Sequence, residues 1–134
     1  MSGDTGIFSL ANYLLNHIDG EDIDFIPGIS SVQVMFARLK RPWNEASILS
    51  IHGRCPDQLP AVIKSSRITA LLTGSPWTPQ EIARFLKENE VPDLRVALGK
   101  NLSYQEEQIV YSSLAQLLND NADYSNTVMV IFNE

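Results

Sequence analysis

The chain is poor in the residues that build disulfides and metal sites. Its 134 residues include one cysteine, Cys55, and two histidines, His17 and His52. A lone cysteine cannot close an intramolecular disulfide, and no His or Cys stands near it at the spacing of a metal site. We therefore expect Cys55 to be a buried or loop-edge thiol, and we expect neither a metal site nor a Cys–His nucleophile.

Basic residues are also scarce. Ten Lys and Arg against 16 Asp and Glu give a formal charge of −6, which disfavours binding to a phosphate backbone. No apolar run is long enough to span a bilayer, and no signal peptide is recognisable. We therefore expect that neither nucleic acid nor a membrane is a partner. We also expect the protein to be cytoplasmic.

The hydrophobic pattern alternates between strand and helix periodicity. It predicts helices at 5–17, 32–39, 57–64, 79–89 and 113–119, and strands at 23–26, 46–51, 68–72, 94–98 and 127–132, with a short extension at 108–111. With 44% hydrophobic residues, the chain can form one core. The alternation implies a largely parallel sheet covered by helices on both faces, a three-layer α/β/α domain.

Four glycine-containing loops are expected at the carboxyl ends of strands. They are Pro27–Ser31, His52–Arg54, Thr73–Ser75 and Gly99–Asn101. Ligands of open α/β sheets bind at this edge, where helix N-termini present unpaired N–H groups. Each glycine alone is equally well explained as a turn residue, but the four together predict a ligand site. For His52, a ligand role and a loop hydrogen-bonding role are equally open.

Three of these regions carry longer motifs. Residues 25–33 read Phe-Ile-Pro-Gly-Ile-Ser-Ser-Val-Gln, residues 48–54 read Ile-Leu-Ser-Ile-His-Gly-Arg, and residues 99–107 read Gly-Lys-Asn-Leu-Ser-Tyr-Gln-Glu-Glu. In order and spacing they resemble the motifs of the tetrapyrrole methylase family, and most of all its precorrin-6Y methylase branch. Lys100 stands where that family usually has Glu. Ser2-Gly3-Asp4 is similar to the motif that ends the first of the family's two domains, with Thr5 in place of Pro.

The resemblance implies part of an S-adenosylmethionine-dependent methyltransferase that acts on a bridge carbon, C5, of a precorrin in cobalamin biosynthesis. It implies that residues 1–20 are the end of an N-terminal domain with a linker helix, and that residues 21–134 form the C-terminal α/β domain. The rest of the N-terminal domain is then missing, so we expect the chain alone to be inactive. The sheet becomes a mixed, mainly parallel one of five strands, with the last strands antiparallel to the rest. Family members are typically homodimers, which we also expect here.

The resemblance also assigns candidate ligand contacts. The positions carried over as S-adenosylmethionine contacts are Asp4, Ile7, Ser30, Ser31, Thr73, Leu98 and Gly99. His52 is the candidate catalytic residue, as a proton acceptor, and it could also contact the substrate. Arg54 is a candidate partner for the precorrin carboxylates, and Arg38 is a second one. Methyl transfer from a sulfonium needs alignment rather than a covalent nucleophile, which agrees with the absence of a catalytic triad.

Two other functions stay open on sequence grounds. One is a sibling methylase that modifies ribosomal RNA or a protein histidine derivative, which the acidic charge and the His52-Gly53-Arg54 loop disfavour. The other is a non-catalytic α/β domain that binds a partner or a nucleotide through the same loops.

Overall fold

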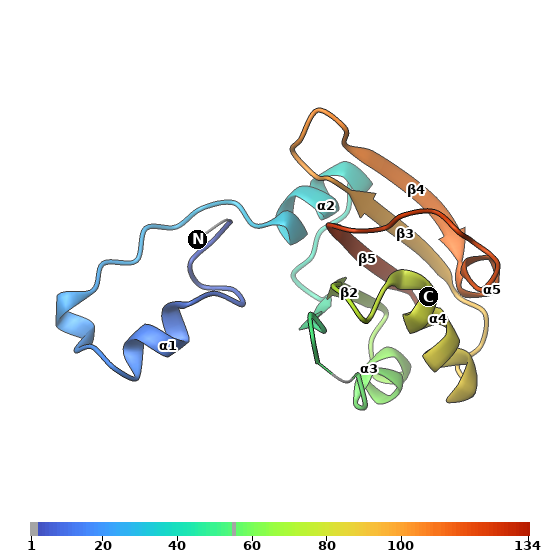
Figure 1. The fold of residues 1–134 in the computed structure, drawn as a ribbon, viewed down its shortest axis with the longest axis horizontal. Coiled ribbons are helices and arrows are strands. Elements are labelled where there is room, and N and C mark those ends of the chain that lie inside the picture. The colour runs from blue at the N-terminus through green and yellow to red at the C-terminus, as the bar shows by residue number, and fades with distance from the viewer. Residues whose placement is uncertain (1–2, 55) are drawn as a thin grey trace.

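The structure is a computed structural model that describes residues 3–54 and 56–134. Cys55 and Ser2, on which two expectations fall, lie outside the described residues. An N-terminal arm, residues 3–29, stands to one side of a sheet domain formed by the rest of the chain (Figure 1). Within the described residues, no helix has the length and apolar character needed to cross a membrane.

The sheet has five strands in the order β1-β2-β5-β3-β4. They are β1 (Ser47–Ser50), β2 (Ile68–Leu72), β3 (Arg95–Lys100), β4 (Gln108–Ser113) and β5 (Thr127–Phe132). The expected mixed sheet, with the last two strands opposed to the others, is confirmed. The expectation of mainly parallel pairing is wrong, because three of the four pairs of neighbouring strands are antiparallel. Because β5 lies between β2 and β3 and runs against both, β1 and β2 form the one parallel pair among the strands of residues 3–54 and 56–134.

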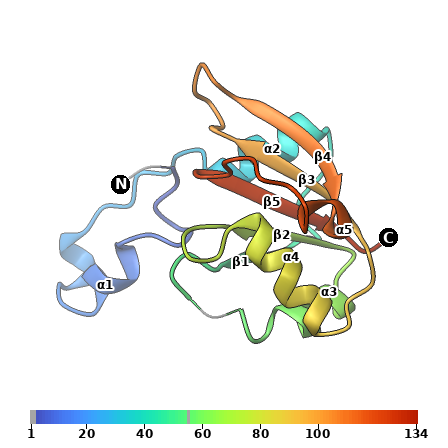
Figure 2. The same ribbon diagram turned by 45° about the vertical axis from the view of Figure 1, so that its right-hand side comes forward.

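Helices cover both faces of the sheet, which confirms the three layers (Figure 2). On one face, α2 (Ser31–Leu39) buries Val32, Met35 and Phe36. On the other face lie α3 (Leu59–Ser65), α4 (Pro79–Glu88) and the short α5 (Leu114–Leu117). Every residue of the central strand β5 is buried between these layers.

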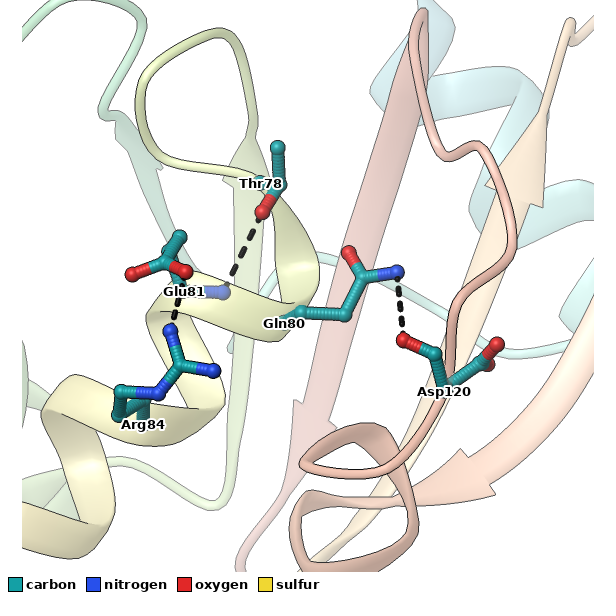
Figure 3. A network of polar contacts seen from close by, with 5 residues as sticks. All are labelled: Thr78, Gln80, Glu81, Arg84 and Asp120. Atoms are coloured by element: carbon teal, nitrogen blue, oxygen red, sulfur yellow. Dashed lines mark hydrogen bonds and ion pairs between the residues drawn. The ribbon is translucent and has the colours of Figure 1, made fainter.

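Helix α4 follows its sequence pattern closely. Thr78 caps it by accepting a hydrogen bond from the backbone N–H of Glu81, and Pro79 occupies the first helical position, where the missing N–H costs nothing (Figure 3). Ile82, Ala83 and Leu86 lie on one side of the helix and are fully buried. The spacing of three and four residues directs these side chains to the sheet.

The arm departs from the sequence expectation. The predicted helix at 5–17 is reduced to α1 (Ala11–Leu15), and residues 23–26 form no strand. A short amphipathic helix draws most of its stability from packing, and here Leu10, Leu15 and Ile18 are exposed. The predicted strand likewise pairs with no strand of the described chain. The fifth strand is instead β4, which the sequence pattern predicted only as a short extension.

Candidate functional site

The turn that precedes α2 is held by a capping box. Ser30 Oγ accepts a hydrogen bond from the backbone N–H of Gln33 at 3.2 Å, and Gln33 Oε1 accepts one from the backbone N–H of Ser30 at 2.7 Å. The two bonds satisfy donors that a helix N-terminus otherwise leaves unpaired. Ser31, the first residue of α2, lies next to this cap.

Asp4 joins the start of the arm to the same turn. Its carboxylate accepts hydrogen bonds from the backbone N–H of Gly6 at 2.8 Å and of Gly28 at 3.0 Å. The bond from Gly28, followed by that from Gly6, lowers the pKa of Asp4 below its ordinary value, because both stabilise the ionised form. At Gly28 a Cβ would lie 2.5 Å from the carbonyl oxygen of Gly3, so only glycine allows this approach.

A cavity of about 450 Å³ opens where the arm, the turn and the sheet edge meet. Five of the seven predicted cofactor contacts line it: Asp4, Ile7, Ser30, Ser31 and Thr73. Its other lining residues are Gly3, Phe8, Ile29, Val34, Leu72, Leu102, Ser103, Tyr104, Asn126, Thr127 and Val128. The structure therefore brings together residues that are distant in the sequence, and we refer to this space as the turn cavity.

The two remaining predicted contacts, Leu98 and Gly99, are not among the residues that line the turn cavity. The Leu98 side chain is fully buried in the core between α4 and the sheet. At Gly99 a Cβ would lie 2.5 Å from Met35 Sδ and 3.0 Å from Leu102 Cδ2. Leu102, rather than either predicted residue, presents its side chain to the cavity.

The predicted loop after Gly99 and a loop that the sequence reasoning missed, residues 119–126, complete the turn cavity, and Asn126 was the available signal for the second. Asn101 and Asn126 have φ of +49° and +50°, a left-handed conformation that asparagine tolerates better than most residues. The backbone N–H of Asn101 donates to the carbonyl of Asn126 at 3.1 Å, which holds the two loops together. Thr73 Oγ1 donates to the carbonyl of Thr127 at 2.7 Å. Because its hydrogen is used in this bond, the hydroxyl can only accept a hydrogen bond from a ligand.

The loop that ends at Asn126 is fixed to α4 and β3. The Gln80 amide donates to the carbonyls of Asp120 and Ala122, the first of these at 3.2 Å (Figure 3). The Tyr124 hydroxyl donates to Asp120, and Lys100 Nζ lies 5.1 Å from the centre of the Tyr124 ring. Burial, together with the Asp120 carboxylate, raises the pKa of Tyr124 to about 12. Lys100, the departure from the family motif, thus contributes a positive charge beside this acidic loop.

His52 and Arg54 line a second cavity, of about 700 Å³, beside the first. We refer to it as the basic cavity, because Arg54 contributes its cation. Asn12, Tyr13 and Ser9 of the arm line its other side. Phe8, Leu72 and Thr73 line both cavities, so the predicted cofactor contacts and the predicted substrate contacts adjoin across one shared wall.

Arg38 is not part of either cavity. Its Nε lies 2.7 Å from Glu107 Oε2, and the other oxygen of Glu107 accepts the backbone N–H of Ser103 at 2.8 Å. Arg38 is thus already paired with Glu107, and its role as a second partner for substrate carboxylates stays a prediction. The residue ties the end of α2 to the loop after β3. Among residues 3–54 and 56–134, no three His, Cys, Asp or Glu side chains are grouped to hold a metal ion.

One family model matches most of the chain. The model described as Tetrapyrrole (Corrin/Porphyrin) Methylases matches residues 1–118. The chain belongs to the tetrapyrrole methylase family. Curated relatives include the cobalt-precorrin-7 C(5)-methyltransferase of Salmonella typhimurium, 32% identical over 135 residues, which cover 99% of this chain and 64% of that protein. The probable cobalt-precorrin-7 C(5)-methyltransferase of Methanocaldococcus jannaschii is 35% identical over 107 residues, 78% of this chain and 49% of that protein.

Solved structures agree with the family assignment. The precorrin-6Y methylase of Archaeoglobus fulgidus is 27% identical, with a TM-score of 0.71 over 98% of this chain and 60% of that one. The uroporphyrin-III C-methyl transferase of Thermus thermophilus in complex with S-adenosyl homocysteine shares the fold at 16% identity, with a TM-score of 0.73 over 98% of this chain and 63% of that one. The chain thus spans at most about two thirds of the length of these relatives.

Proposed function

We propose that this chain is part of an S-adenosylmethionine-dependent methyltransferase that methylates C5 of a precorrin in cobalamin biosynthesis. The observation that carries the proposal is the shared wall of Phe8, Leu72 and Thr73 between the turn cavity and the basic cavity. A methyl donor in one cavity and an acceptor in the other would meet where these three residues border both spaces. The names and identities of the curated relatives support the same reaction.

The residues of the turn cavity fit the proposed methyl donor. A volume of about 450 Å³ is in the range of ligand pockets. The cavity combines the hydroxyls of Ser31 and Thr73 with the apolar side chains of Ile7 and Leu102, which suit the polar ribose and the flat adenine of an adenosyl group. The ionised Asp4 beside it suits a ligand with a cationic centre.

S-adenosylmethionine supplies a methyl group on a positively charged sulfur, which is already a good leaving group. The chain itself then has to orient the acceptor carbon and remove one proton for each methyl group added to a C–H position. His52 stands in the basic cavity as the acceptor of that proton, and Arg54 pairs with a carboxylate of the ring periphery.

We further propose that residues 21–134 are the C-terminal α/β domain of the methylase and that residues 1–20 are the end of its N-terminal domain with a linker helix, which packs against the rest of that domain. Phe8, Leu10, Tyr13 and Leu15 are half exposed or nearly so, at 47 to 59%. An exposed group of large apolar side chains of this kind marks a surface that another part of a protein covers. The expected homodimer stays a prediction, which sedimentation of the full-length gene product tests.

Titration of the 15N-labelled chain with S-adenosyl homocysteine tests the cofactor site. Under the proposal this chain forms only one side of the cofactor cleft, so we expect weak binding that requires millimolar ligand. We expect changes in the amide chemical shifts of Ser31, Thr73 and Asn126. Ser31→Ala should weaken the response, whereas Ser65→Ala, an exposed serine near the opposite end of β2, should leave it unchanged. Shifts that avoid the turn cavity would contradict the assignment.

Activity needs the full-length gene product, labelled S-adenosylmethionine and cobalt-precorrin-7. We expect His52→Ala and Arg54→Gln each to lower kcat/KM by about 100-fold, the usual scale of a proton acceptor or of a well-aligned contact. Lys64→Gln is a matched surface control on α3 and should keep the parent rate. Unchanged rates in the first two variants would remove His52 and Arg54 from the site.

A further inference from the structure

His52 rests on Gly74, the residue that follows Thr73 in the loop after β2. At Gly74 a Cβ would lie 1.7 Å from His52 Nδ1, 2.5 Å from Cε1 and 2.6 Å from Cγ. The three closest atoms all belong to the imidazole, and real Cβ atoms do not approach other atoms this closely. The ring therefore lies with its Nδ1 corner directly on the Gly74 backbone, with Nε2 at the far corner.

The backbone conformation of Gly74 does not itself call for glycine. Its φ lies outside the left-handed region, so the backbone suits any L-residue. The backbone N–H of Trp77 donates to the Gly74 carbonyl at 2.9 Å, which fixes the loop independently of any side chain at 74. The missing side chain thus serves one purpose that the structure shows, which is to make room for His52.

The seat places His52 between two spaces. The imidazole lines the basic cavity with Arg54, and it also lines a third cavity, of about 660 Å³, with Tyr124 and Gln80. Thr73 lines both of these spaces and the turn cavity as well. Without a fixed seat, an exposed imidazole on a loop samples several rotamers, and only some of them point into the basic cavity.

We propose that Gly74 is a positioning residue for His52: by lacking a side chain it leaves room for the imidazole in the place where it lines the basic cavity. This inference rests on the proposed function for its kinetic consequence, but the seat itself can be tested without any reaction. Gly74 does not line the turn cavity, and the proposal gives it no contact with the reacting atoms. It is therefore a positioning residue and not a catalytic one.

Spectroscopy of the chain tests the seat directly. Only two histidines occur, so each ring resonance is assigned by a single substitution, and His17, stacked on Tyr13 in the arm, is an internal reference. In Gly74→Ala we expect the His52 ring 1H, 13C and 15N signals to move while those of His17 stay in place. Unmoved His52 signals in a folded Gly74→Ala variant would overturn the proposal.

Kinetics of the full-length product, with cobalt-precorrin-7 as acceptor, test the consequence. We expect Gly74→Ala to lower kcat about tenfold or more, the scale of a misplaced group, and to leave KM for S-adenosylmethionine unchanged. In a His52→Ala background the same change should have no further effect, because no ring remains to be displaced. Equal losses in both backgrounds would show a merely structural role and overturn the proposal.

The two tests separate this inference from the proposed function. If no variant, nor the parent, transfers a methyl group to the precorrin, the proposed function fails while the shift of the His52 signals still establishes the seat. If the parent is active and His52→Ala reduces its rate but Gly74→Ala does not, the proposed function stands and the positioning role of Gly74 is refuted.

Discussion

Substitution of Ser30 probes the turn on which the candidate site is built. Ser30→Ala removes the oxygen that accepts the Gln33 N–H at 3.2 Å, in a residue that is 7% exposed. Loss of a serine cap costs about 1 kcal/mol of unfolding free energy. With a urea m-value of about 2 kcal/mol/M, the unfolding midpoint should fall by about 0.5 M. Ser30→Asp keeps a capping oxygen and should restore the midpoint.

A matched cap elsewhere makes the result specific. Thr78→Ala in α4 removes the same kind of bond, to the N–H of Glu81 at 3.3 Å, away from the turn cavity. Both alanine variants should lose comparable stability in urea unfolding followed by circular dichroism. Only Ser30→Ala should also weaken the amide shifts caused by S-adenosyl homocysteine. An unchanged midpoint in Ser30→Ala, beside a clear fall in Thr78→Ala, would refute the capping argument.

Two further predictions concern the arm and the acidic loop. Gly28→Ala sets a Cβ against the Gly3 backbone and should release the start of the arm, seen as faster proteolysis before residue 28, whereas Gly20→Ala, which meets only an ordinary contact, should not. The pKa of Tyr124 is raised to about 12, so its stabilisation is complete below pH 10 and is lost as the pH rises toward 12. Tyr124→Phe should flatten that part of the stability profile, and the exposed Tyr111→Phe should leave it intact.

The sheet domain was predictable because its patterns are local. Residues 68–72 and 127–132 form strands with the predicted bounds, and the predicted start of α4 at Pro79 is correct. In these segments the burial is decided within the domain itself, so a run of apolar residues or a capping residue indicates its own structure. Strand direction is not a local property. Alternating helices and strands suggested parallel pairing, and nothing in residues 127–132 shows that this strand inserts between β2 and β3 in the opposite sense.

The arm was not predictable by the same reasoning. Its apolar residues carry a helix period at 5–17 and a strand run at 23–26, yet the structure forms one helical turn or so and no strand. A pattern indicates which face would be buried, but the element forms only where something covers that face. Phe25, Ile26 and Ile29 are exposed, which is the physical reason why the pattern and the structure disagree.

Gly99 shows how a motif residue can matter without touching a ligand. Its backbone permits alanine, but the added Cβ would lie 2.5 Å from Met35 Sδ and 3.0 Å from Leu102 Cδ2. Overpacking of this kind costs about 1–3 kcal/mol, and a shift of Leu102, which lines the turn cavity, would alter the shape of that cavity. Gly99→Ala should therefore lower both the unfolding midpoint and the response to S-adenosyl homocysteine. In a Met35→Val background, where the sulfur is gone, the added cost should shrink. If Gly99→Ala lowers the unfolding free energy by the same amount in that background, the contact with Met35 Sδ is not the reason for the loss.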